Sequence, residues 1–128
     1  MLFPNYNKAD VCKALTAVFP SSEFEFISTY GNAVELIGKH TETRLWIRLI
    51  VSDTPNKILV DFSNINLDPS IRRKGMFSRA VHAVLDLDCV DEVLVSSVLT
   101  EVMHKACQSL SMVYDENISG YRLDKENH

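Results

Sequence analysis

A short basic turn in the middle of the chain has the residue types and the spacing of an anion-binding site. Residues 72–75 read Arg-Arg-Lys-Gly, and they lie between a β-rich stretch at 57–66 and a stretch of helical periodicity that begins near Met76. The first N–H groups of a helix lack partners within the helix, and the helix dipole adds partial positive charge there. Gly75 would let a ligand approach the backbone, and the cations would add attraction. The sequence therefore predicts a phosphate site at a helix start.

The same cluster also has a simpler interpretation. With Arg79 included, four cations fall within eight residues of a chain whose formal net charge is −4. Such a cluster can be no more than the solvated end of a helix, and by itself the basic turn favours that interpretation. The pattern around the turn is what favours a ligand.

That wider pattern resembles the acetyl-coenzyme A (acetyl-CoA) motif of the GCN5-related N-acetyltransferases, the GNAT family. The chain reads Leu67-x-Pro69-x-x-Arg72-x-x-Gly75-x-Phe77, which is similar to the family motif V-x-P-x-x-[RQ]-x-x-G-x-[GA]. In that family the loop binds the pyrophosphate of acetyl-CoA, and the end of the preceding strand pairs with the pantetheine arm. The resemblance therefore implies acetyl-CoA as co-substrate.

The resemblance assigns contacts to acetyl-CoA residue by residue. Leu67 would offer its backbone to the pantetheine arm. The pyrophosphate cradle would consist of Arg72, Arg73, Lys74, Gly75, Met76, Phe77 and Ser78. Phe77 departs from the family motif, which has glycine or alanine at that position. Because backbone amides hold the phosphates, a Phe77 side chain turned into the core would leave the cradle usable.

The resemblance also locates the acyl transfer, in a gap between the strand before the motif and the strand after its helix. A lysine-like amine has a pKa near ~10.4, so removing its proton at pH 7 costs roughly 4–5 kcal/mol and calls for a base or a water relay. Asp61 and Ser63 share one face of the earlier strand, and Asp61 is the candidate general base. Glu25 and Glu35 are alternatives. The simpler interpretation of each carboxylate is an exposed side chain on a strand, with no role in catalysis.

The sequence identifies an acid for the departing thiolate less directly than it identifies a base. The family commonly supplies a tyrosine within a helical pattern N-x-x-A-x-x-x-Y, and these positions hold Thr100, Met103 and Cys107 here. Cys107 falls on the apolar stripe of its predicted helix, which favours a core thiol over an acid. Tyr114 and Tyr121 follow nearby without the family's spacing, and Tyr114 is the candidate acid.

Composition and length describe an ordinary globular protein. The 128 residues are 46% hydrophobic and 23% charged, and the acidic balance argues against general nucleic-acid binding. No apolar run approaches the ~18 residues that span a membrane, and the first residues lack a signal-peptide pattern. Three widely spaced cysteines are typical of reduced thiols, and the four histidines have no metal-ligand spacing. We expect one cytoplasmic domain over 1–128, with a frayed tail at 124–128 and no metal.

The periodicity of apolar residues predicts an α+β fold, a mixed and mostly antiparallel sheet flanked by helices. Its order follows the GNAT topology, abbreviated at the amino terminus, where one helix is clear instead of a strand and two helices. The predicted helices are 8–19, 76–87 and 100–110. The predicted strands are 23–28, 33–38, 44–51, 57–66, 92–98, 112–114 and 121–123.

Three functions are compatible with these features. The first is an acetyl-CoA-dependent N-acetyltransferase, in which an amine of a small molecule or protein attacks the thioester directly. The second is a catalytically silent relative that binds a partner, with or without CoA. Phe77, the missing tyrosine and the short amino-terminal part favour this second function. The third is an unrelated α+β binding domain in which the basic turn merely starts a helix. The acceptor amine cannot be named from the sequence, and a homodimer is compatible with each function.

Overall fold

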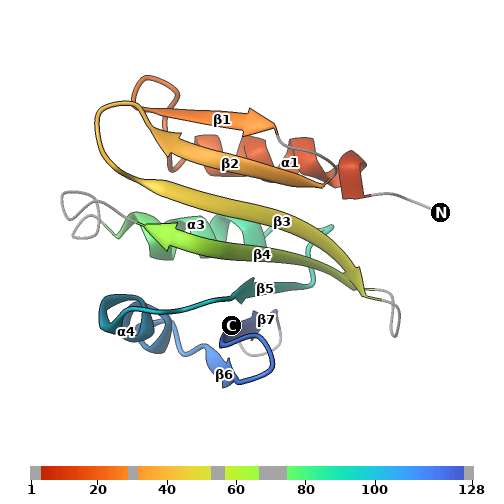
Figure 1. Ribbon diagram of the computed structural model, residues 1–128. Coiled ribbons are helices and arrows are strands. Elements are labelled where there is room, and N and C mark those ends of the chain that lie inside the picture. Colours follow the sequence, from red (N-terminus) through yellow and green to blue (C-terminus); the bar gives the residue numbers. More distant parts are fainter. Residues whose placement is uncertain (1–3, 29–31, 53–56, 67–74, 126–128) are drawn as a thin grey trace.

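A seven-stranded sheet with the strand order β1-β2-β3-β4-β5-β7-β6 organises the chain. The computed structural model describes residues 4–28, 32–52, 57–66 and 75–125 (Figure 1). The helices are α1 (Pro4–Thr16), α3 (Met76–Leu85) and α4 (Glu101–Ser109). The strands are β1 (Phe24–Ser28), β2 (Ala33–Gly38), β3 (Arg44–Ser52), β4 (Lys57–Asn66), β5 (Glu92–Val95), β6 (Val113–Asp115) and β7 (Gly120–Asp124).

The topology confirms the predicted α+β class. Strands β1 to β4 form an antiparallel meander, β4 pairs with β5 in parallel through the α3 crossover, and β7 and β6 complete the sheet in antiparallel register. Within residues 4–28 a single helix precedes the first strand, as expected for an abbreviated amino terminus. No helix in the described residues is long and apolar enough to cross a membrane.

Two elements end three residues before the predicted position, each for a local reason. Helix α1 ends at Thr16 rather than at residue 19, because the Val18 N–H bonds the Leu15 carbonyl at 3.0 Å and tightens the chain into a turn. Strand β5 ends at Val95 rather than at residue 98, because Ser97 takes a positive φ of 55° and the chain leaves the sheet. The second difference matters for the site.

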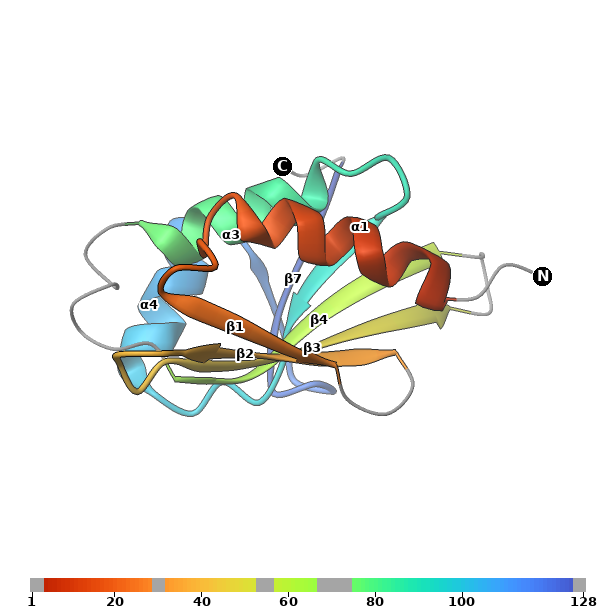
Figure 2. The ribbon, with the colours of Figure 1, turned by 90° about the horizontal axis from the view of Figure 1, so that it is seen from above.

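The core lies on one face of the sheet, beneath the helices. Helices α1 and α3 lie side by side over this face (Figure 2). Alternate strand side chains point towards them and are almost fully buried, including Leu36, Ile47, Val60, Phe62 and Val93. Burying such side chains contributes roughly 1.5–3 kcal/mol each.

Helix α4 packs on the same face further along the sheet. Its Thr100 cap accepts a hydrogen bond from the Met103 N–H at 3.2 Å, as predicted for a threonine at that position. Met103 and Cys107 are buried, and His104 Nδ1 lies 2.9 Å from the hydroxyl of Tyr121 on β7. Across the described parts of the chain, no helix covers the opposite face of the sheet, which we call the open face (Figure 2).

Candidate functional site

Strands β4 and β5 separate at one end of their pairing and open a wedge in the sheet. Their parallel ladder ends with Phe62 opposite Val95, and the Ser96 N–H adds a last bond to the Phe62 carbonyl at 3.0 Å. Beyond that point β4 continues to Asn66 alongside β3, while the chain after Ser96 turns towards α4. The side of β4 that faces the wedge therefore has no strand partner among the described residues.

A bulge bends β4 beside this wedge. Arg44 pairs with Asn66 and Trp46 pairs with Ser63, so β4 has one more residue than β3 between these two pairs. Asn64 takes a positive φ of 49° there, a conformation that asparagine adopts more readily than most residues. A bulge leaves the extra residue unpaired and changes the direction of the side chains after it. The sequence prediction of a regular strand over 57–66 did not include this bulge.

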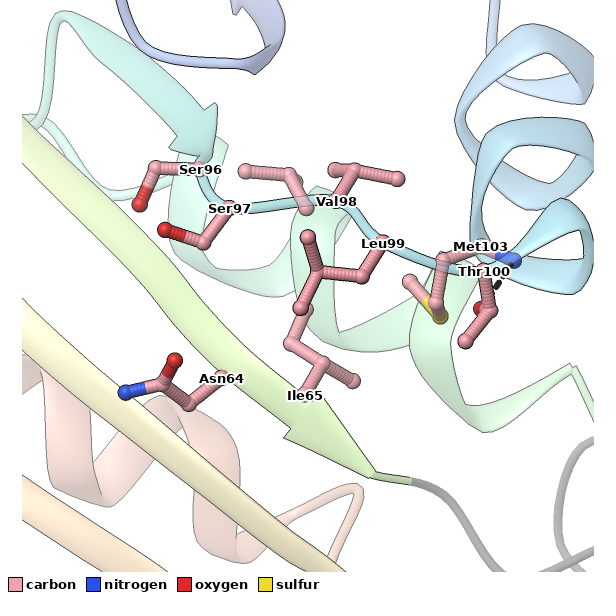
Figure 3. Close-up of a pocket in the computed structure, with 9 residues that line it drawn as sticks. Asn64, Ile65, Ser96, Ser97, Val98, Leu99, Thr100 and Met103 are labelled. Atoms are coloured by element: carbon pink, nitrogen blue, oxygen red, sulfur yellow. Dashed lines mark hydrogen bonds between the residues drawn. The ribbon is translucent and has the colours of Figure 1, made fainter.

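The wedge holds a mostly apolar cavity on the helix side of the sheet. Its volume is about 210 Å³, and we call it the helix-side pocket (Figure 3). The side chain of Ile65, which the bulge turns towards the core, lies on one side of it, with Met103 of α4 nearby. The residues that line it are Asn64, Ile65, Val95, Ser96, Ser97, Val98, Leu99, Thr100 and Met103.

A second cavity, polar in its lining, approaches the same wedge from the open face. Its volume is about 230 Å³, and we call it the open-face pocket. It is lined by Trp46, Arg48, Ser63, Asn64, Ser96 and Ser97. Asn64, Ser96 and Ser97 line both pockets, so the two cavities approach one another through the gap between β4 and β5. Two molecules could therefore meet there from opposite faces of the sheet.

Asp61 lies beneath the open-face pocket, and its exposure was predicted wrongly. We expected an exposed strand carboxylate, but the side chain is 1% exposed. Its Oδ2 accepts hydrogen bonds from Arg48 Nη2 at 2.6 Å, from Arg48 Nε at 3.2 Å and from Ser96 Oγ at 3.0 Å. Its Oδ1 is buried and has no hydrogen-bond partner among the described residues. The carboxylate is buried because β3 and β5 flank it, and its two partners come from β3 and from the residue that follows β5.

The alternative carboxylates lie further from the wedge. Glu35 on β2 forms an ion pair with Arg44 at 3.0 Å, and Glu25 on β1 is exposed. Neither residue lines one of the two pockets. Asp61 is therefore the predicted base that the fold brings nearest to the wedge, through its hydrogen bond with Ser96.

The start of α3 has an exposed, glycine-initiated backbone. Gly75 is the N-cap with φ 68° and ψ 20°, and no described side chain caps the helix. A Cβ atom at Gly75 would meet no described residue within 4 Å, so the described part of the chain leaves the space beside it open. Leu67, Arg72, Arg73 and Lys74, the other residues assigned to the cofactor, lie outside the described residues.

The side chains of Met76 and Phe77 turn away from this start and into the core. Phe77 is 6% exposed and packs edge-on against Phe62, with ring centroids 6.4 Å apart. Phe77 is thus turned into the core, the orientation on which a usable cradle would depend. Ser78 is half-buried, and its carbonyl lies 3.0 Å from His82 Nδ1. The large side chain at the last motif position therefore does not occupy the space beside Gly75.

The candidate acids all lie away from the wedge. Tyr114 stands on the edge strand β6, half-exposed, with its ring centroid 5.2 Å from that of Tyr121. Tyr121 is buried, and its hydroxyl contacts His104 and Gln108. Cys107 is fully buried, and burial raises the pKa of its thiol to about 12, which agrees with a core thiol. None of the three lines either pocket.

This architecture is similar to that of a solved acetyltransferase. A tyrosine-to-phenylalanine mutant of the toxin AtaT, a GNAT-family enzyme bound to the C-terminus of the antitoxin AtaR, matches with a TM-score of 0.50 and 16% sequence identity. The match covers 73% of this chain and 68% of that chain. The chain has the GNAT-like fold. No family model and no curated protein sequence matches it.

The GNAT-like fold brings in one residue that sequence reasoning missed. Ser96 lines both pockets and donates its hydroxyl hydrogen to Asp61, 35 positions earlier in the chain. The only signal in the sequence was a pair of serines at the end of the β-rich run 92–98. The parallel pairing of β4 and β5 is what places Ser96 beside Asp61. In the described part of the GNAT-like fold, no group of three or more histidine, cysteine or acidic residues could hold a metal ion.

Proposed function

We propose that this protein is an N-acetyltransferase that transfers the acetyl group of acetyl-CoA to an amine. The observation that carries the proposal is the pair of pockets that approach one another at the wedge from opposite faces of the sheet. An acyl donor on the helix side and an amine on the open face would meet between β4 and β5. The GNAT-like fold supports the same assignment.

The residues on the helix side fit acetyl-CoA. The unpaired side of β4 near Asn64 offers backbone groups to the amides of the pantetheine arm, and the apolar helix-side pocket suits the arm's methylene groups. The diphosphate would lie at the start of α3, where N–H groups of the first turn and the helix dipole attract an anion. The described residues leave the space beside Gly75 free for it.

Acetyl-CoA would supply an acyl thioester, and the chain would orient the amine and take its proton. The amine would lie in the open-face pocket beside Ser96. Ser96 Oγ donates to Asp61 Oδ2, so its oxygen is free to accept a hydrogen bond from the amine. As the N–C bond forms and the C–S bond breaks, the amine proton would pass to Ser96 and the Ser96 proton to Asp61. Thus Asp61 would act as the base through Ser96.

A silent relative that binds CoA without turnover is the second candidate function. The observation that favours it is the lack of an acid at the wedge. The residues lining the two pockets include no tyrosine, cysteine, histidine or carboxylate in the described part of the chain. In a transferase with this lining, the thiolate would have to leave without a protein acid, which a thiolate tolerates better than an alkoxide does.

A thermal shift assay with acetyl-CoA tests the proposal. A ligand that binds only the native state at 100 times its Kd raises the free energy of unfolding by about 2.7 kcal/mol. Gly75→Glu should abolish the shift, since it puts a carboxylate where the diphosphate would lie. Gly75→Ala is the matched control, because it shares the cost of a positive φ but adds neither charge nor reach. It should keep most of the shift.

Turnover separates the two candidates. Release of CoA thiol in the presence of a panel of amines supports the transferase, whereas a thermal shift without release favours the silent relative. If the wild-type protein shows no thermal shift at millimolar acetyl-CoA, both candidates are wrong.

A further inference from the structure

The open-face pocket contains a guanidinium that is held in place yet retains unused hydrogen-bond donors. Arg48 Nε and Nη2 both bind one oxygen of Asp61, at 3.2 and 2.6 Å. The Arg48 side chain is 50% exposed and lines the pocket. Among the described residues, its Nη1 has no acceptor. An arginine fixed by a buried carboxylate, with N–H groups facing a cavity, is well suited to bind a carboxylate of a ligand.

The lining of this pocket argues against a purely cationic amine as the acceptor. An ammonium group without a counter-charge is normally held by exposed carboxylates, and the described lining has none. The nearby Asp61 is already paired with Arg48, and its second oxygen is buried. An acceptor that carries its own negative charge would satisfy the spare donors of Arg48 and leave the amine free.

The distances limit how far apart the two groups of the acceptor can be. Arg48 Nη2 and Ser96 Oγ contact the same Asp61 oxygen, at 2.6 and 3.0 Å, so the guanidinium and the hydroxyl at the wedge are close neighbours. An anion on Arg48 and an amine beside Ser96 are therefore separated by only a few bonds. The α-amine and carboxylate of an amino acid have such a short spacing, whereas the ε-amine and the carboxylate of a lysine do not.

Trp46 supplies the apolar part of the same surface. It lies two residues before Arg48 on β3, on the same face of the sheet, half-buried, and it lines the pocket. An apolar or aromatic side chain of an acceptor would lie against its indole ring. We infer that the acceptor is a free amino acid with an apolar side chain, bound by its carboxylate to Arg48 and with its amine at Ser96. The acetylation of that amine rests on the proposed function, but the binding of the amino acid does not.

Isothermal titration of the purified protein with L-phenylalanine and with phenethylamine tests this inference. The two ligands differ only in the carboxylate. We expect phenylalanine to bind the wild-type protein at least about tenfold more tightly, which is the effect of one charge-assisted bidentate contact. Equal binding of the two ligands, or no binding of phenylalanine at millimolar concentration, would overturn the inference on the wild-type protein alone.

Two substitutions assign the effect to the guanidinium. Arg48→Lys keeps a positive charge beside Asp61 but loses the planar fork, and it should remove most of the preference for phenylalanine. Arg44→Lys is the matched control, because Arg44 lies on the same strand and face, forms an exposed ion pair with Glu35, and does not line the pocket. A preference that survives Arg48→Lys contradicts the inference.

The outcomes distinguish this inference from the proposed function. If acetyl-CoA binds and phenethylamine is acetylated as efficiently as phenylalanine, the proposed transferase is supported and the inference of an amino-acid acceptor is wrong. If phenylalanine binds through Arg48 but acetyl-CoA gives no thermal shift, the inferred amino-acid site is supported and the proposed transferase function is wrong.

Discussion

Two arginines on the open face of the sheet have the same kind of partner but differ in how completely they are used. Arg122 on β7 binds both oxygens of Glu92 through Nε and Nη2, at 3.0 and 2.9 Å, and binds Asp115 through Nη1 at 2.9 Å. Arg48 on β3 binds one oxygen of Asp61 and leaves its Nη1 without an acceptor in the described parts of the chain. All three guanidinium nitrogens of Arg122 donate hydrogen bonds to described residues, whereas only two of the three in Arg48 do.

This difference indicates that Arg122 serves the fold and that Arg48 serves ligand binding. The hydrogen bonds with Glu92 and Asp115 raise the pKa of Arg122, and the group ties β5, β6 and β7 together. Arg48 is held from one side only, and the remaining N–H groups are exposed at the open-face pocket. Stability alone would not require a spare donor beside a cavity, so we assign the Arg48 cluster to ligand binding and the Arg122 cluster to the fold.

The largest expected effect is on stability, when each arginine is removed. Arg48→Met leaves the carboxylate of Asp61, which is 1% exposed, without its counter-charge, and breaking such a buried pair costs about 3 kcal/mol or more. Arg122→Met should cost clearly less, because Glu92 and Asp115 keep more contact with water. Urea unfolding measures both losses.

The double variant Arg48→Met/Asp61→Asn is the control for this first prediction. It removes both charges together and should recover a large part of the lost stability. If Arg122→Met proves the more destabilising of the two single variants, the burial of the unpaired carboxylate is not what decides the loss of stability.

The next effect is on turnover. Ser96→Ala removes the hydroxyl between the amine and Asp61, and kcat/KM should fall about 100-fold, the usual contribution of a positioned proton relay. Ser109→Ala, which removes an exposed hydroxyl on α4, is the matched control and should leave kcat/KM unchanged. A pH–rate profile provides a second measurement, because the loss of a relay should alter its acid limb. A drop of less than about threefold with an unchanged profile would remove Ser96 from the mechanism.

A smaller effect concerns pH and the Arg122 cluster. The Arg122 guanidinium, followed by the Asn117 N–H, holds the pKa of Asp115 below its ordinary value. A depressed carboxyl pKa adds stability above the pKa of the unfolded chain, and this contribution is lost as the pH falls through the folded pKa. The stability difference between wild type and Asp115→Asn should therefore narrow as the pH falls from about 6 to about 3, as thermal unfolding would measure. A stability difference that stays constant over this pH range would contradict the role of Arg122 in lowering the pKa of Asp115.

The smallest effect is expected at the candidate acid. Tyr114 belongs to the edge strand beside the Arg122 cluster and does not line either pocket, so Tyr114→Phe should change kcat by less than about twofold. The measurement is thiol release at saturating substrate. A loss of tenfold or more would return Tyr114 to the acid role predicted from the sequence and would extend the catalytic region to β6.

Most of the fold could be predicted because each element repeats a local pattern. The alternation of buried with more exposed residues marks β3, and the stripe from Phe77 to Leu85 marks α3. These patterns are set by burial of one face, so a single sequence contains them. The position of Phe77 was predictable for the same reason, since it falls on the buried stripe of its helix.

The site was less predictable because its parts come from different strands. Asp61 looked exposed, since its own strand gives no sign that Arg48 on β3 and Ser96 just after β5 flank it. The bulge at Asn64 has no strong sequence signal either, because it depends on the register of β3 against β4. The burial of Asp61 and the position of the bulge thus depend on the pairing between strands, which the periodicity along one strand does not contain.

The single extra residue of that bulge also decides which way the end of β4 faces. Side chains alternate along a strand, so Ile65 would share the face of Asp61 and Ser63 if the ladder were regular. With the bulge, Ile65 packs partly against the core, and Asn66 takes the outward position beside Arg44 and Ile37. The one extra residue thus reverses the alternation of the strand: if all residues were kept and the bulge were lost, Ile65 would face water and Asn66 would face the core.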